Sequence, residues 1–173
     1  FSVMINFVDY LIPQSAATSD IDIASDAGNT IPRELLTSIR GMDGIKEVYG
    51  RRSAFDVPAI LTGDTDFSST VDLISYDDFD LQCLKKDGTL KRGSDLSEVY
   101  GDSRFVLATS DQDSTWKIGD TVQIGEETLT IAGLLKNDPF SENGLTNGKL
   151  TLITSGETFF RLTGTEDYSL VLI

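Results

Sequence analysis

The chain has 173 residues, of which 39% are hydrophobic and 24% charged, enough to bury one sizeable core or two small lobes. Its 28 acidic and 14 basic residues give a formal net charge of -14. This charge excludes nucleic acid as a partner, because phosphate binding relies on Lys and Arg, and it opposes binding to anionic lipid. The chain has no histidine, which removes the commonest general base and every His-based zinc site or catalytic triad.

The run from Phe1 to Ile12 is apolar on nearly every side but too short to cross a bilayer. Two interpretations are open for it: a core helix, or the outer end of a transmembrane helix. The chain contains no signal peptide and no apolar run of 18 or more residues. Because it starts at Phe1 and stops within a strand pattern at Ile173, we expect a longer natural protein. Residues 1–19 are then a membrane-proximal stem or linker.

A β-α-β order is predicted for the next part of the chain. Alternation at residues 20–23 predicts a half-buried strand, and residues 45–58 predict a second strand. Between them lies a helix with Thr30 as its cap, Pro32 in its first turn and Gly41 as a left-handed stop. Its apolar stripe comprises Leu35, Leu36 and Ile39. This order favours two parallel strands with a right-handed crossover.

Beyond residue 60, short strands alternate with turn residues. The Thr-, Ser-, Asp- and Gly-rich segment 61–70 predicts a boundary. The elements predicted after it are a strand at 71–75, a helix from Ser75 to near Gly88, a helical turn at 96–100, a strand at 105–109, a hairpin about Gly125, a strand at 149–154, a helix from Ser155 to Gly164 and a strand at 168–173.

Several short motifs resemble catalytic or ligand-binding sequences, and each has a simpler structural explanation. Gly101-Asp102-Ser103 resembles the nucleophile triplet of lipase-like hydrolases, which need a histidine partner. The segment 144–150 resembles a phosphate loop, but it is one residue short between its glycines and precedes a strand. Cys83 is predicted to be a small buried residue on an apolar helix face.

Acidic residues are also too scattered to predict a calcium site or a glycosidase pair. None of the clusters completes a calcium-loop code, and we interpret them as solvated turns and caps: Asp20/Asp22, Asp64/Asp66, Asp77/Asp78/Asp80 and Asp111/Asp113. We therefore expect no catalytic residue, no cofactor and no metal.

Five segments resemble, in their order and spacing, the extracytoplasmic domains of FtsX/MacB-like ABC transporter permeases. They read VDLISYDDFDL, SRFVLATS, KIGDTVQIGEETLTIAGLLK, KLTLITSGETFFRLTG and YSLVLI, within residues 20–173. The resemblance implies a two-lobed α+β fold: a β-α-β (porter-like) lobe built from both chain ends, 20–60 and 145–173, and an inserted β-rich (sabre-like) lobe, 61–144. The chain departs from the family pattern because a last helix and strand of the end-formed lobe are missing.

The resemblance also implies a function and a location. In such permeases the domain lies on the extracytoplasmic face of the cell membrane, between the first two transmembrane helices. It is non-catalytic and couples ATP-driven motion of a cytoplasmic ABC ATPase subunit to export or to an extracellular partner, a mode called mechanotransmission. The implied partners are the permease's own transmembrane helices, the ATPase, and a peptide, lipoprotein or cell-wall component. The intact transporter is expected to be a dimer, and the isolated domain a monomer.

Two other functions remain open at this point. The alternative is an extracellular module of a resistance-type ABC permease that senses or binds a peptide or an antibiotic, and the third is a secreted hydrolase. Partner contacts are expected on exposed loops of the inserted lobe. Three residues are the candidates: Trp116, at the end of the 111–116 loop, and Phe140 and Leu145 in the segment 137–148. As a lone aromatic, Trp116 also fits a core or rim position.

Overall fold

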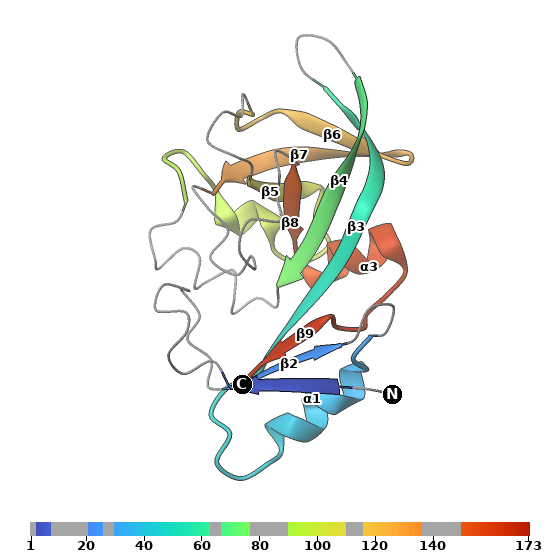
Figure 1. Cartoon of the computed structure of the whole chain (residues 1–173). Coiled ribbons are helices and arrows are strands. Elements are labelled where there is room, and N and C mark those ends of the chain that lie inside the picture. The colour runs from blue at the N-terminus through green and yellow to red at the C-terminus, as the bar shows by residue number, and fades with distance from the viewer. Residues whose placement is uncertain are drawn as a thin grey trace.

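A computed structural model describes residues 3–7, 21–25, 30–62, 67–76, 90–109, 116–135 and 150–173 (Figure 1). Both helices and strands are present, which confirms the predicted α+β class. The described elements are β1 (Val3–Phe7), β2 (Ile21–Ser25), α1 (Arg33–Arg40), β3 (Tyr49–Leu61), β4 (Phe67–Tyr76), the 3₁₀ helix η1 (Leu96–Val99), β5 (Phe105–Thr109), β6 (Thr121–Ile124), β7 (Glu127–Leu134), β8 (Thr151–Thr154), α3 (Gly156–Thr163) and β9 (Leu170–Leu172).

The described strands form one sheet in the order β1-β2-β9-β3-β4-β8-β5-β7-β6. The last strand, β6, also pairs with the far end of β3, at Ile60 and Leu61. Strands β3, β4, β8, β5, β7 and β6 therefore close into a ring, which we call the barrel. Closure leaves no unpaired edge between its first and last strands. Strands β9, β2 and β1 extend from the other end of β3, and we call them, with α1, the side sheet (Figure 1).

The side sheet is a split β-α-β unit. Strands β2 and β3 each run antiparallel to β9, so they are parallel to one another, as predicted. They are not neighbours in the sheet, because β9 from the end of the chain lies between them. Helix α1 covers this unit and buries its apolar stripe in a cluster that comprises Ile23, Ile31, Leu36, Ile39, Val48, Tyr168 and Val171.

The start of the chain differs from both helical interpretations. Val3–Phe7 form the strand β1, which pairs antiparallel with β2 along its whole length. An all-apolar short run does not distinguish a strand from a helix by its periodicity, and pairing with β2 decides the outcome here. The other residues of the 1–19 segment lie outside the described residues.

The helix ends were predicted with mixed success. Helix α3 is capped by Ser155, whose side chain accepts a hydrogen bond from the Thr158 N–H, and it stops at Gly164 with φ 77°, both as predicted. Helix α1 instead has Pro32 at its N-cap and Gly41 in a right-handed conformation with φ -82°. Thr30 does not cap α1, because its hydroxyl donates to Asp167, at 3.0 Å.

Most of the other predictions for the second half are confirmed. The strand at 105–109 is β5, the turn at 96–100 contains η1, and the hairpin about Gly125 joins β6 to β7. The turn-rich segment 61–70 is strand at both of its ends, because Leu61 ends β3 and residues 67–70 begin β4, while residues 63–66 lie outside the described residues. The start of the helix predicted from Ser75 is wrong, because Ser75 and Tyr76 still belong to β4. The rest of that helix, with Cys83, and the phosphate-like loop at 144–149 lie outside the described residues.

Strand β3 serves both the barrel and the side sheet and is bent between them. Its register against β4 shifts between Ala54 and Val57, which marks a β-bulge. Within the bulge, Asp56 adopts φ 56°, unusual for a residue with a side chain, and its N–H donates to the buried carboxylate of Asp72, at 3.1 Å. Bulges bend the strand that carries them and turn side chains outward, and Phe55 beside this one is 68% exposed.

Two further apolar clusters fill and surround the barrel. Its interior holds side chains from every one of its strands together with Phe159, which enters from α3 and is fully buried. The second cluster packs η1 against the outside of β5, β7 and β8, and includes Leu96, Val99, Leu107 and Ile153. The C-terminal helix α3 is therefore part of the barrel's packing, while its following residues lead to the side sheet (Figure 1).

Candidate functional site

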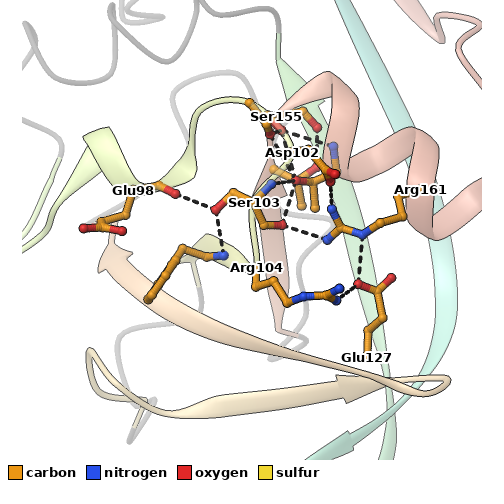
Figure 2. Close-up of polar contacts among 11 residues, drawn as sticks. Glu98, Asp102, Ser103, Arg104, Glu127, Ser155 and Arg161 are labelled. Atoms are coloured by element: carbon orange, nitrogen blue, oxygen red, sulfur yellow. Dashed lines mark hydrogen bonds and ion pairs between the residues drawn. The ribbon is translucent and has the colours of Figure 1, made fainter.

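A polar network joins the start of α3 to the turn that precedes β5 (Figure 2). The Ser155 hydroxyl donates to the Gly101 carbonyl, lies 3.1 Å from the Thr158 hydroxyl, and accepts from the Thr158 N–H. The Thr158 hydroxyl accepts from the Ser103 N–H at 3.1 Å and lies 3.0 Å from the Ser103 carbonyl oxygen. Ser155 and Thr158 are fully buried, so these bonds satisfy polar groups that water does not reach.

Arg161, one turn further along α3, extends the network to β7. Its guanidinium contacts the carboxylates of Asp102 and Glu127 and donates to the Ser103 carbonyl at 2.7 Å. Glu127 is also paired with Arg104, so its carboxylate lies between two guanidinium groups. The side chains of Arg161 and Glu127 are 24% and 22% exposed. Half-buried pairs with several hydrogen bonds hold their geometry better than surface pairs do.

The Gly101-Asp102-Ser103 triplet serves this network rather than a nucleophile. Its serine hydroxyl donates to the Glu98 carbonyl and accepts from the Phe105 N–H, as expected for a turn. Gly101 has φ 73°, a conformation that glycine adopts at little cost. Asp102 faces Arg161 instead of orienting a base, and the chain has no histidine to serve as one. The geometry agrees with the structural interpretation of this motif.

Beside the network lies a cavity of about 700 Å³, which we call the arginine cleft. Helix α1 forms one wall and α3 the other, while β3 and the segment between α3 and β9 contribute its floor. Four arginines line it, from three different elements: Arg33, Arg40, Arg52 and Arg161. Its lining also contains the carboxylates of Asp102, Glu157 and Glu166, so the cleft has a small net positive charge in a chain of net charge -14.

Arg52 and Tyr168 form the floor of the arginine cleft. The guanidinium carbon of Arg52 lies 4.2 Å from the centroid of the Tyr168 ring, and its Nε donates to the Glu166 carbonyl at 2.9 Å. The wall formed by α1 is held less firmly, because the Arg33–Glu166 pair, at 3.3 Å, joins side chains that are 61% and 50% exposed. Phe160 on α3 adds an apolar surface, 48% exposed.

The residues predicted for partner binding do not line this cleft as far as the structure describes them. Trp116 is partly buried and packs against the apolar cluster of the barrel, the core or rim position considered from sequence. Phe140 and Leu145 lie outside the described residues, so their relation to Trp116 stays a prediction. The arginines of the cleft were missed, although Arg33 and Arg40 are seven residues apart, two turns along one face of a helix.

Comparison with solved structures finds the same fold in transporter domains. The chain matches the extracellular domain of the noncanonic ABC-type transporter YknZ from Gram-positive bacteria with a TM-score of 0.55 and 16% identity, over 82% of this chain and 71% of that one. It matches the periplasmic region of MacB from Actinobacillus actinomycetemcomitans with a TM-score of 0.54 and 16% identity, over 83% of this chain and 64% of that one. No family model and no curated protein matches the sequence.

These likenesses define the class of fold: that of the extracytoplasmic domains of ABC-type transporter permeases. More particularly, it is the fold of the MacB and YknZ domains, and the resemblance expected from the sequence motifs is confirmed at this level. Within the residues that the structure describes, no helix is long and apolar enough to span a membrane. The same residues contain no group of three or more Cys, Asp or Glu side chains arranged to hold a metal ion.

Proposed function

We propose that this chain is a non-catalytic extracytoplasmic domain of an ABC transporter permease. It couples ATP-driven motion of a cytoplasmic ATPase subunit to export or to an extracellular partner. The observation that carries the proposal is the fold shared with the YknZ and MacB domains. The engagement of Ser103 in a turn supports a role without catalysis.

The arrangement of strands suggests how motion would pass through the domain. The first and last described strands, β1 and β9, lie on either side of β2 in the side sheet. Segments anchored in a membrane before β1 and after β9 would move this sheet directly. β3 would carry the displacement into the barrel, because it pairs with β9 at one end and with β6 at the other.

The polar network would make the barrel follow that displacement as one body. It holds α3 to the turn before β5 and to β7 (Figure 2), while the residues after α3 lead back to β9 (Figure 1). Motion of β9 would therefore reach the barrel by two routes: through its strand pairing with β3, and along the chain segment that connects it to α3.

The division into lobes belongs to this proposal. We propose that residues 1–19 form a membrane-proximal stem, that 20–60 and 145–173 form the end-formed lobe, and that 61–144 form the inserted lobe. The separate apolar cluster beneath α1 supports an end-formed lobe. Residues of β8 and α3, such as Leu152 and Phe159, pack with the inserted strands, so the two lobes would share a tight interface.

The proposal places the domain on the extracytoplasmic face of the cell membrane and names its partners. These are the permease's own transmembrane helices, the cytoplasmic ATPase, a second copy in the intact transporter, and a peptide, lipoprotein or cell-wall component. Trp116, Phe140 and Leu145 are proposed to contact that extracellular partner. If replacing all three left transport or resistance unchanged in a folded domain, this assignment would be wrong.

Membrane purification of the gene product that contains this chain tests the proposal. We expect an ABC ATPase subunit to copurify from detergent-solubilised membranes. We also expect Glu126→Cys, in the exposed turn between β6 and β7, to react with an impermeant maleimide in intact cells when it is combined with Cys83→Ser, while Cys83→Ser alone serves as the control. Labelling only after lysis, or purification without an ATPase, would contradict it.

A second function, extracellular ligand sensing, is favoured by one observation. The arginine cleft is a cavity with both charged and apolar lining, the usual composition of a recognition site. Coupling and sensing are compatible, because a bound ligand that changes the relation of α1 to α3 would change the motion that β3 receives. The nature of such a ligand is taken up below.

A further inference from the structure

The arginines of the cleft are spread along it rather than gathered at one point. Arg33 and Arg40 lie two turns apart on α1, about 10 Å along the helix axis. Arg52 lies on the floor and Arg161 on the opposite wall, formed by α3. A single small anion could contact only some of these four guanidinium groups at once. A ligand with several separated negative groups matches it better.

One carboxylate already occupies a position that a ligand could take. Glu166 pairs with Arg33 at 3.3 Å, and both side chains are at least half exposed. Exposed pairs of this kind contribute less than about 1 kcal/mol, so an incoming carboxylate can replace Glu166 at little cost. Guanidinium groups bind carboxylates through two parallel hydrogen bonds, which makes Arg33 and Arg40 suited to acidic side chains. Arg40 already donates to the Val48 carbonyl at 3.1 Å and has a further contact, so a ligand carboxylate would compete with these for its N–H groups.

The cleft also offers apolar contacts next to its charges. Phe160 is 48% exposed and projects from α3 at the cleft, and the Tyr168 ring lies on the floor beneath Arg52. Inorganic anions gain nothing from such surfaces. A peptide that carries an apolar side chain between its carboxylates gains both kinds of contact.

We infer that the arginine cleft binds a peptide segment with at least two acidic side chains and an apolar one between them. The acidic groups pair with Arg33 and Arg40, and the apolar side chain packs on Phe160. This inference names the ligand class of the second proposed function, sensing. It stands or falls separately from the coupling role, because it concerns the isolated chain and needs no ATPase.

Selection from a random displayed peptide library against the 173-residue chain tests the inference. We expect enriched peptides to carry paired Asp or Glu residues flanking Leu or an aromatic residue. An enriched peptide is then synthesised with a fluorophore, together with a version in which Asn and Gln replace its acidic residues. Fluorescence anisotropy should show that the amide version binds at least tenfold more weakly.

Paired variants locate the binding. R33Q/R40Q should raise the peptide's Kd about tenfold or more, while R92Q/K117Q, which removes the same charge outside the cleft, should leave it within about twofold. A second pair does not depend on α1: Phe160→Ala should weaken binding, and Phe55→Ala, which removes an even more exposed ring elsewhere, should not. Thermal denaturation checks that each variant is folded.

Each alternative result has a definite meaning. Equal weakening by both charge variants would show that net charge rather than the cleft governs binding, and would overturn the inference. Competition by inorganic diphosphate in a stoichiometric, saturable manner would replace the peptide with a small phosphate ligand. No acidic enrichment in the library would also overturn the inference, and copurification with an ATPase would remain the separate test of coupling.

Discussion

Arg52 on β3 and Tyr168 before β9 stack on one another, with the guanidinium carbon 4.2 Å from the ring centroid. The same ring lies against Gly50, where the two strands β3 and β9 begin to pair. Tyr168 also forms a bridge with Ile31, just before α1. This one aromatic residue therefore joins β3, β9 and the approach to α1, and it forms the floor of the arginine cleft.

The contact between Gly50 and Tyr168 predicts a large effect of a single methyl group. A Cβ at residue 50 would lie 2.0 Å from the Tyr168 ring, a distance that no packing allows. Gly50→Ala should lower the free energy of unfolding by about 1–3 kcal/mol, measured by urea denaturation. Gly41→Ala is the control, because its Cβ would meet its nearest atom at 3.6 Å and its φ is ordinary. Equal stability of the two variants would mean that the Tyr168 ring does not pack against residue 50.

Arg161 should contribute more to stability than an arginine in an exposed pair. Arg161→Gln removes contacts with Asp102 and Glu127 and a hydrogen bond to the Ser103 carbonyl. We expect the free energy of unfolding to fall by about 1–3 kcal/mol. Arg33→Gln, which breaks only the exposed pair with Glu166, should cost less than about 1 kcal/mol. Urea unfolding curves with unchanged slopes give both values.

If Arg161→Gln proved no more destabilising than Arg33→Gln, the network would not hold α3 in place. The proposed second route from β9 to the barrel would then lose its support, and β3 alone would remain.

Truncation of two successive phenylalanines on α3 should change the stability by very different amounts. Phe159 is fully buried inside the barrel, whereas Phe160 is 48% exposed at the arginine cleft. Phe159→Ala should lower the free energy of unfolding by about 3–5 kcal/mol, because it leaves a cavity. Phe160→Ala should change it by less than about 1 kcal/mol. Similar losses for both would contradict the orientation of α3.

Local patterns in the sequence predicted the elements whose determinants are themselves local. The β6–β7 hairpin follows from alternation about Gly125, and the bounds of α3 follow from Ser155 and Gly164. The position of β9 between β2 and β3, and the closure of the barrel by β3 and β6, depend on pairing between residues far apart in sequence. Periodicity within one segment carries no information about which strand it will meet.

In the candidate site, too, some features follow from local sequence and others from contacts between distant residues. Spacing on α1 places Arg33 and Arg40 on one helix face, which the sequence alone could have suggested. Arg52 and Arg161 join them only through the packing of β3 and α3, and Asp102 through the turn before β5. Trp116 was predicted as a binding residue because it is an aromatic residue in a loop, but it packs against the barrel core.

The proposed coupling requires that the domain move in response to ATP on the other side of the membrane. Cys83→Ser removes the only cysteine of this sequence, and any cysteines elsewhere in the transporter are replaced in the same way. Glu126→Cys then places one spin label at the β6–β7 turn of each copy in the assembled transporter. Electron–electron resonance should give different inter-label distance distributions for the nucleotide-free complex and for the ATP-bound complex with hydrolysis blocked. The same distribution in both states would contradict the coupling function.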